Sequence, residues 1–165
     1  MVLSMDIYEF LKNYGISFER FDHPAVFTCE EAEKYCPEMP GASIKNLFLR
    51  DKNGLRHFLV VVGAKKNVDL KKLQQVLSVS KLSFGSPERM QKYLGVEPGS
   101  VTLLGLMNDG EHAVEVIIDA EVWGKPLQCH PLVNTATCVI QKEGLEKFFK
   151  ATGHTFKVIH LPSKV

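Results

Sequence analysis

The sequence predicts an α+β fold with a mixed β-sheet, in a single domain that spans residues 1–165. Hairpin-type strand pairs are mixed with isolated helices, whereas a doubly wound parallel sheet needs strands and helices in strict alternation. The chain is long enough to bury a core without disulfides or metal ions. Its composition, 45% hydrophobic and 24% charged, is typical of a globular domain.

The first third of the chain predicts two helices and a strand between them. Apolar residues share one helical face over Ser4–Tyr14, and Gly15 ends that helix. Ile16–Phe21 alternates as a strand does. Thr28–Glu31 is a capping box, which begins a short helix that ends before Pro37.

The middle of the chain predicts a hairpin followed by two helices. Ile44–Arg50 and Leu55–Val62 are apolar runs on either side of Asp51–Gly54, which has the composition of a hairpin turn. Asp69 caps the first helix. Ser86–Gly95 holds the second helix, because it begins with Ser-Pro and ends with glycine.

The last third predicts three strands and a helix. Val96–Asn108 is interrupted by glycine and proline, so we expect it to be irregular. Val114–Ile118 and Ala136–Ile140 are apolar strands. Lys142–Ala151 is a helix, and Phe156–His160 is the last strand.

Charge is unevenly distributed, although the net charge is only +1. Residues 45–92 hold eleven Lys or Arg against three Asp or Glu, residues 1–44 hold three against eight, and residues 93–165 hold six against eight. A basic middle between acidic ends is expected of a surface that meets a polyanion. The alternative is a set of scattered, solvated lysines.

Compartment and cofactor class follow from what the sequence lacks. No apolar run approaches the roughly 18–20 residues of a membrane span, and the N-terminus does not resemble a signal peptide. The four cysteines, Cys29, Cys36, Cys129 and Cys138, form neither a CxxC pair nor a zinc spacing. We therefore expect a cytoplasmic protein with reduced thiols, no metal ion, no cofactor and no membrane partner.

Familiar catalytic motifs are absent. The sequence holds no GxSxG elbow, Walker loop, GxGxxG or HExxH motif. It holds instead His130–Thr135, where a histidine, an amide and a hydroxyl lie between apolar stretches. Buried polar groups need partners, so this segment either closes its own turn or lines a pocket. His130 is a base, an orienting group, a metal ligand or a turn residue, and the lack of a second ligand at a suitable spacing disfavours the metal. Asn134 and Thr135 either bind a ribose or amide or close the turn.

Other segments also carry candidate residues. Lys45 lies on a strand face otherwise made of leucines, so its ammonium group reaches either the sheet edge or a ligand. Neighbours in a strand face opposite sides, so Lys45 and Asn46 reach one ligand only if the chain is irregular. Gly99–Leu103 is either a plain loop or a cradle of backbone N–H groups. His23-Pro24 is interpreted as a structural turn.

Four segments carry a resemblance to a known family. In order, they are His23–Thr28 with Glu30–Ala32, Lys45–Leu49, Pro98–Thr102 and His130–Thr135. Together they resemble the YbaK/prolyl-tRNA synthetase-associated editing family, specifically its free-standing alanyl-tRNA(Pro) deacylases. The likeness runs from about residue 5 to about residue 160.

The resemblance implies a compact domain with a barrel-like mixed sheet that hydrolyses the ester between a wrong amino acid and tRNA(Pro). A synthetase pocket shaped for proline rejects smaller alanine weakly, since a missing methylene gives only about 1–3 kcal/mol. A second pocket that admits alanine and excludes proline corrects the error. The implied partners are the acceptor end of mischarged tRNA(Pro) and prolyl-tRNA synthetase, with no DNA.

The resemblance also implies roles for particular residues. Lys45 is expected near the terminal phosphate or ribose, and Asn46 and His130 position the aminoacyl end. The Gly99–Leu103 segment maps to the family's GxxxP loop, whose backbone meets the adenosine and the scissile carbonyl. The expected substrate-binding residues are Gly99, Ser100, Val101, Leu103 and Asn134.

The expected mechanism is attack by water, since no residue is an obvious nucleophile. The ribose hydroxyl of the substrate orients this water, His130 and Asn134 orient the substrate, and loop amides stabilise the oxyanion. Leu103 stands where the family has proline, which leaves the contacts of the loop open.

Three other functions stay open at this point. The first is deacylation of another mischarged product, such as Cys-tRNA(Pro). The second is a non-catalytic module that binds tRNA or a synthetase. The third is a small-molecule ester or amide hydrolase, which the uneven charge disfavours.

Overall fold

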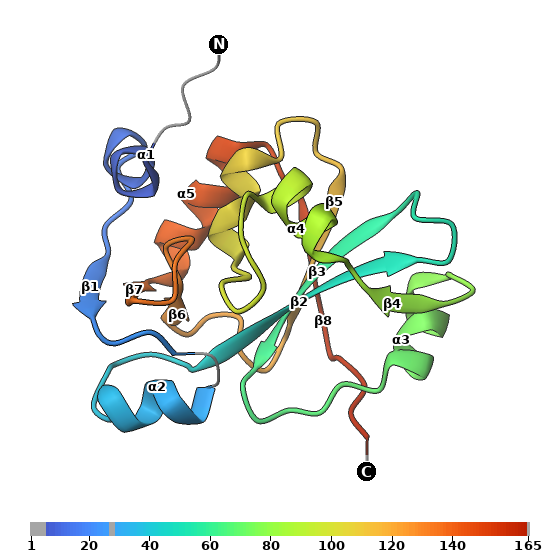
Figure 1. The fold of residues 1–165 in the computed structure, drawn as a ribbon, viewed down its shortest axis with the longest axis horizontal. Helices are drawn as coiled ribbons and strands as arrows, with labels where there is room; N and C mark the ends of the chain where they lie inside the picture. Colours follow the sequence, from blue (N-terminus) through green and yellow to red (C-terminus); the bar gives the residue numbers. More distant parts are fainter. Residues whose placement is uncertain (1–5, 27–28, 165) are drawn as a thin grey trace.

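Two β-sheets organise the fold (Figure 1). The structure, a computed structural model, describes residues 6–26 and 29–164. Its strands are β1 (Glu19–Asp22), β2 (Ile44–Asp51), β3 (His57–Gly63), β4 (Leu82–Phe84), β5 (Val114–Asp119), β6 (Leu127–Cys129), β7 (Ala136–Ile140) and β8 (Phe156–Ile159). The five-stranded sheet has the order β4-β2-β3-β5-β8, and the three-stranded sheet has the order β1-β7-β6.

The larger sheet is mixed, as predicted. β2 runs antiparallel to β3 and β4, whereas β3, β5 and β8 run parallel to one another. The smaller sheet is antiparallel throughout. Within the described residues the strands do not close into a barrel; the two sheets instead meet at a bridge between Ala42 and Leu127.

The helices end where their caps predict. They are α1 (Ile7–Asn13), α2 (Cys29–Tyr35), α3 (Leu70–Leu77), α4 (Pro87–Leu94), α5 (Lys142–Thr152) and the 3₁₀-helix η1 (Leu103–Asn108). The side chains of Asp69 and Ser86 accept hydrogen bonds from first-turn N–H groups of α3 and α4. Gly95 ends α4 with a φ of 66°, a conformation that favours glycine. The predicted cap Thr28 lies outside the described residues.

Three short elements were not predicted, namely β4, β6 and η1. β4 and β6 have three residues each, and they pair with β2 and β7. η1 packs against α4, where the side-chain amide of Asn108 donates to the carbonyl oxygen of Leu94 at 2.9 Å. β1 begins at Glu19 rather than Ile16, because its pairing with β7 begins there.

The larger sheet separates two hydrophobic clusters. The smaller cluster lies between this sheet and α3 and includes Leu49, Val60 and Leu73. The larger cluster includes Phe48 and Val61, together with residues of α1, α5, η1 and the three-stranded sheet. Because side chains alternate along β2, neighbouring residues of that strand face different clusters.

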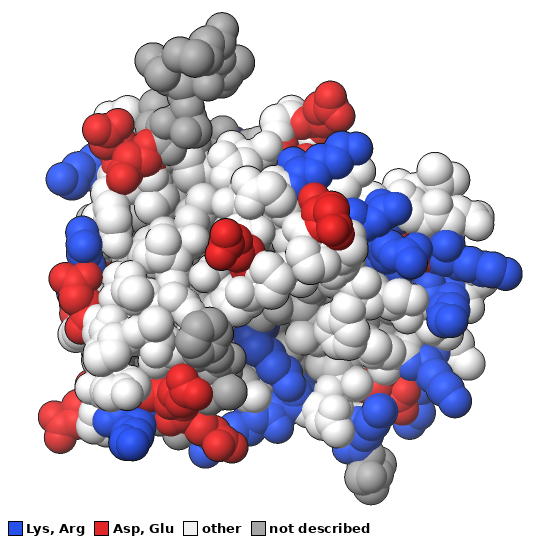
Figure 2. Space-filling view, viewed as in Figure 1, with Lys and Arg blue, Asp and Glu red and all other residues white. Residues whose placement is uncertain are grey.

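Surface charge follows the uneven distribution along the sequence. Figure 2 shows Lys and Arg gathered over the tip of the β2–β3 hairpin, β4 and the neighbouring helices, whereas Asp and Glu are prominent over α1, β1 and α2. Basic side chains are also visible in a hollow near the middle of this face. No helix among the described residues is long and apolar enough to cross a membrane.

Candidate active site

The start of β2 lies beside β6 at the junction of the two sheets. Ala42 and Leu127 form a parallel bridge, flanked by backbone hydrogen bonds of 2.7 and 3.1 Å. In parallel segments, residues at the same distance from a bridge lie beside each other along the strand direction. Lys45 and His130 each follow the bridge by three residues, so Lys45 and Asn46 lie at about the same height along the strands as His130, the residue that follows β6. The junction therefore brings together the two parts of the predicted site that are most distant in sequence.

Lys45 and Asn46 nevertheless occupy opposite faces of β2. The β2–β3 register is continuous from Ile44 to Arg50, without the irregularity that a shared orientation needs. Asn46 shares the face of the larger cluster, and Lys45 shares the face of the smaller one. Within the described residues no carboxylate pairs with the Lys45 ammonium group. This half-buried cation can therefore serve an anionic ligand.

Asn46 carries an unsatisfied acceptor. Its side-chain Oδ1 is buried and has no hydrogen-bond partner among the described residues. Buried polar atoms in folded proteins are normally paired, because an unpaired one costs free energy. This oxygen is a site where a ligand can place a hydrogen-bond donor.

His130 begins the loop that joins β6 to β7. Its Nδ1 lies 3.3 Å from the carbonyl oxygen of Ala136, so Nδ1 carries the proton and Nε2 is left as an acceptor. Burial lowers the pKa of His130, because the imidazolium ion is desolvated; the hydrogen bond to Ala136 O acts in the opposite direction, and the charge of nearby His23 makes a smaller lowering contribution. Within the loop, Leu132 has a φ of 66°, which leucine rarely adopts, so surrounding contacts hold the loop.

Asn134 supplies some of these contacts. Its side-chain Nδ2 donates to Val26 O at 2.9 Å, and its backbone carbonyl oxygen accepts from Val26 N at 3.1 Å. The next contacts come from His23, whose backbone N–H donates to Thr135 O at 3.0 Å and whose Nε2 lies 2.9 Å from Thr137 Oγ1. The structure thus adds His23, interpreted from sequence as a turn residue, to the surroundings of His130. The available signal was that His23 begins the first segment of the resemblance.

Thr102 and Leu103 anchor the Gly99 loop. The Thr102 hydroxyl caps η1 by accepting from Leu104 N at 3.2 Å. Leu103 is fully buried in the larger cluster, so its side chain faces the core. Burial and capping therefore restrain the loop at the position where a family proline would restrain φ.

The same loop presents unpaired backbone donors. Gly99 has a φ of 89°, and the N–H of Ser100 is already bonded to Glu97 O at 3.0 Å. The N–H groups of Val101, Thr102 and Leu103 donate to no acceptor among the described residues. Unpaired N–H groups in a partly buried loop can stabilise a carbonyl oxygen that gains negative charge.

The buried thiols are poor nucleophiles. Cys129 and Cys138 lie opposite each other in β6 and β7, and both are free. Burial raises the pKa of Cys138 to about 11 and raises that of Cys129 further, so both stay protonated at neutral pH. In the described part of the chain, no group of three His, Cys, Asp or Glu could hold a metal ion.

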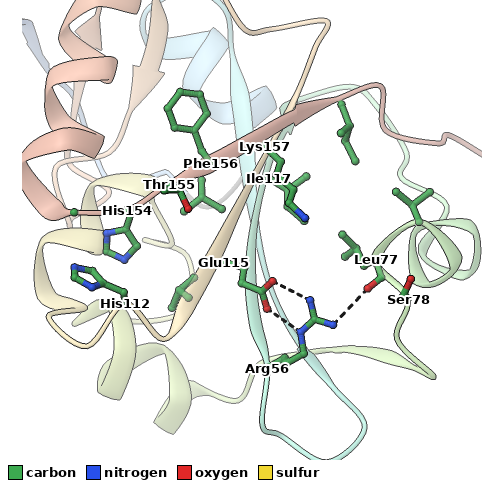
Figure 3. A pocket seen from close by; sticks show the side chains of 15 residues that line it. Arg56, Leu77, Ser78, His112, Glu115, Ile117, His154, Thr155, Phe156 and Lys157 are labelled. Atoms are coloured by element: carbon green, nitrogen blue, oxygen red, sulfur yellow. Dashed lines mark hydrogen bonds and ion pairs between the residues drawn. The ribbon is translucent and has the colours of Figure 1, made fainter.

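A cavity of about 440 Å³ lies elsewhere, between α3 and the β5–β8 edge of the larger sheet (Figure 3). Arg56 spans one end, donating to the Glu115 carboxylate at 2.8 and 2.9 Å and to Leu77 O at 3.4 Å. Lys157 and His112 also line it. None of the predicted site residues lines this cavity, so it is separate from the sheet junction.

Known proteins resemble the chain over nearly all of its length. The profile of the family described as aminoacyl-tRNA editing domain matches residues 23–148. The chain is 44% identical to the prolyl-tRNA editing protein ProX of Acetoanaerobium sticklandii, with 92% of this chain and 93% of that protein covered. It is 35% identical to prolyl-tRNA synthetase associated domain-containing protein 1 of Danio rerio, covering 93% and 84%.

A solved structure confirms the fold. It is described as a candidate trans-editing enzyme for prolyl-tRNA synthetase, and it matches with a TM-score of 0.71 and 20% identity. The match covers 99% of this chain and 100% of that one. At this identity the likeness concerns the fold alone.

Proposed function

Because the chain belongs to the aminoacyl-tRNA editing domain family, we propose that it is an aminoacyl-tRNA deacylase that acts in trans on mischarged tRNA(Pro) and removes alanine. The bond cleaved is the ester between the amino acid and a ribose hydroxyl of the terminal adenosine. The observation that supports the proposal is that the start of β2 lies beside β6 at the sheet junction, where Asn46 carries a buried oxygen without a partner among the described residues. The mischarged tRNA would come from prolyl-tRNA synthetase, in the cytoplasm.

Lys45 binds the RNA backbone at this site. Its ammonium group lacks a carboxylate partner within the described residues, and the terminal phosphate of the acceptor end supplies a negative charge. The first half of β2 borders β6, since the pairing with β4 begins only at Leu49. The long side chain can therefore extend around this edge, although Lys45 and Asn46 start on opposite faces.

Asn46 and His130 hold the amino acid. An aminoacyl ester has a free α-ammonium group with three N–H donors, which matches two acceptors, Asn46 Oδ1 and His130 Nε2. The lowered pKa of His130 keeps its ring neutral, and only a neutral ring accepts. Asn134 acts indirectly, because its amide holds the loop through Val26.

The Gly99 loop stabilises the oxyanion. Water, oriented by the neighbouring ribose hydroxyl, adds to the carbonyl carbon; the bond to the ribose oxygen then breaks, and that oxygen takes a proton. A family proline at the position of Leu103 would lack an N–H, and the Ser100 N–H is bonded to Glu97 O. Val101 and Thr102 are therefore the donors that this chain and its relatives can share.

The test is release of labelled amino acid from three substrates. Alanyl-, cysteinyl- and prolyl-tRNA(Pro) are each incubated with the protein, with Lys45→Ala as the inactive control. We expect alanine to be released, prolyl-tRNA(Pro) to stay intact and the variant to be at least about 100-fold slower while it remains folded. Faster release of cysteine would overturn the alanine assignment, and no release from any substrate would leave a binding module.

A further inference from the structure

Two histidines lie on either side of Thr137 on one face of the smaller sheet. One residue beyond the last β6–β7 pair, His130 lies opposite Thr137. From the other side, Phe21 pairs with Thr137. Because side chains alternate, His23 points to the same face as Phe21. Thr137 therefore lies in the middle of a diagonal His-Thr-His row: His130 is opposite Thr137, whereas the His23 side chain reaches Thr137 from a position beside Thr135.

Hydrogen bonds fix both rings to consecutive residues of β7. His23 Nδ1 lies 2.9 Å from Pro24 O, which can only accept, so Nδ1 carries the proton. His23 Nε2, 2.9 Å from Thr137 Oγ1, then accepts from the Thr137 hydroxyl. His130 is held on the preceding carbonyl, that of Ala136. A change at one ring thus reaches the other through Ala136 and Thr137, which are consecutive and both buried.

We propose that His23 is a positioning residue of the candidate site, which acts on His130 through Thr137 and through its own charge. Its hydrogen bonds hold the His130 loop in place. Positive charge on the His23 ring opposes protonation of His130. Burial is the larger cause that lowers the pKa of His130, and His23 acts in the same direction. His130 thereby stays a neutral acceptor to lower pH.

Among the residues that the structure describes, few other charged groups adjoin the two rings. On the β1 side, Asp22 is paired with Arg20 at 2.9 Å. The thiols of β6 and β7 are neutral, as their raised pKa values require. The acidic first turn of α2 begins six residues after His23. Removal of His23 therefore takes away both the hydrogen bond to Thr137 and the effect of the His23 charge on His130.

An NMR titration tests the charge effect without substrate. The ring proton signals of His130 are followed against pH in the parent protein, in His23→Asn and in His160→Asn, an exposed control. Asparagine at position 23 keeps an acceptor for Thr137 and removes the charge. We expect the His130 midpoint to move to higher pH in His23→Asn and to stay unchanged in His160→Asn. An unchanged midpoint in His23→Asn would overturn the charge effect.

A kinetic test addresses the link through Thr137, and this arm rests on the proposed function. Thr137→Val removes the hydroxyl and keeps the shape, whereas Thr137→Ser keeps the hydroxyl. We expect kcat for alanyl-tRNA(Pro) to fall about two- to tenfold in the valine variant, the effect of one lost neutral hydrogen bond, and to recover in the serine variant with KM little changed. Equal kcat in the two variants would overturn the link.

The two arms separate this proposal from the proposed function. If the parent protein releases no amino acid from any tRNA, the proposed function fails, and the His130 midpoint still decides whether His23 controls its charge. If deacylation occurs, the acid limb of its pH profile should move with the NMR midpoint in His23→Asn. A profile that stays fixed while the midpoint moves would contradict the role of His130 as the neutral acceptor served by His23.

Discussion

Asn46 links stability and activity at the scale of a single residue, because its buried oxygen finds no partner among the described residues. Such an atom destabilises a folded protein by about 1–3 kcal/mol. We expect Asn46→Val to raise the free energy of unfolding by about 1 kcal/mol, since valine also suits a strand. We expect kcat/KM to fall about 10- to 100-fold, because a charge-assisted hydrogen bond to the substrate is lost. Denaturant unfolding and single-turnover deacylation measure the two effects.

Asn53→Ala is the matched control for this change, because Asn53 lies in the exposed hairpin turn. It should alter neither quantity by more than a small amount. A less stable Asn46→Val protein with full activity would show that the Asn46 oxygen serves the fold and not the substrate.

Residue patterns pointed to Lys45, Asn46 and His130 but not to His23. The first three residues are polar groups within apolar segments, which is a signal that a single sequence contains. His23 lies next to a proline in a polar segment, and its partner Thr137 is 114 residues away. Only the pairing of β1 with β7 brings them together, so sequence spacing could not reveal the contact.

The η1 element begins at Leu103, and this start makes Leu103→Pro informative. The first position of a helix tolerates proline, and the Leu103 N–H has no acceptor among the described residues. We expect kcat to change less than about threefold if Val101 and Thr102 are the oxyanion donors, while trimming of the buried leucine lowers the free energy of unfolding by about 1–3 kcal/mol. Single-turnover kinetics and thermal unfolding check both expectations.

A different kinetic outcome would reassign the donor. Loss of one oxyanion donor typically costs about 100- to 1000-fold in kcat. A folded Leu103→Pro protein with a loss of that size would show that the Leu103 N–H itself contacts the oxyanion.

The connection between β3 and α4 predicts a pH dependence of stability. His57 is buried, and its Nε2 accepts from Arg89 Nη1 at 2.8 Å. Burial, followed by the charge of Arg89, lowers the pKa of His57. Since only the unfolded state binds the proton readily, the free energy of unfolding should fall as pH drops below about 6.5. His130 adds to the same trend.

His57→Gln tests this prediction, because glutamine keeps an acceptor for Arg89 and does not titrate. Urea unfolding between about pH 7 and about pH 5 should show a weaker loss of stability in His57→Gln than in the parent or in the exposed control His160→Gln. The carboxyl groups of Asp51 and Asp109, with pKa values lowered from 3.8, contribute only at still lower pH. Equal slopes in all three proteins would contradict the assignment.

Elements with local signals were predictable, and elements made by distant pairing were not. The β2–β3 hairpin has its turn between two apolar runs, and α3 and α4 have their caps at the expected positions. β4 and β6 are too short for a period to be recognised, and β4 pairs with β2, from which β3 and α3 separate it in the chain. The junction of β2 with β6, on which the site depends, belongs to this second kind.

The charge distribution of the whole molecule predicts a response to salt. Lys52 and Lys81 are exposed and adjoin the Asp51–Leu82 pair at the end of the β2–β4 pairing. Figure 2 shows Lys and Arg gathered over β4 and the tip of the β2–β3 hairpin. If two phosphates of the acceptor stem bind there, kcat/KM should fall about tenfold when salt rises from about 50 to about 200 mM. The Lys52→Gln/Lys81→Gln double variant should flatten this dependence, whereas Lys150→Gln on α5 should not.

A steep salt response that survives in the double variant would place the RNA on another surface. At this scale the sequence was informative, because the counts of charged residues by segment already divided the chain into acidic and basic parts. The counts could not show that the basic part extends from the hairpin tip toward the sheet junction, because that depends on how β2 is placed.

The central claim is that an aminoacylated RNA end binds at the junction of the two sheets. The most direct test is a titration of isotope-labelled protein with a non-hydrolysable 3′-amide analogue of alanyl-adenosine, followed by backbone amide shifts. The account predicts the largest shifts at Asn46, Val101 and His130. Shifts confined to Thr155 and Lys157, in the cavity beside α3, would contradict it.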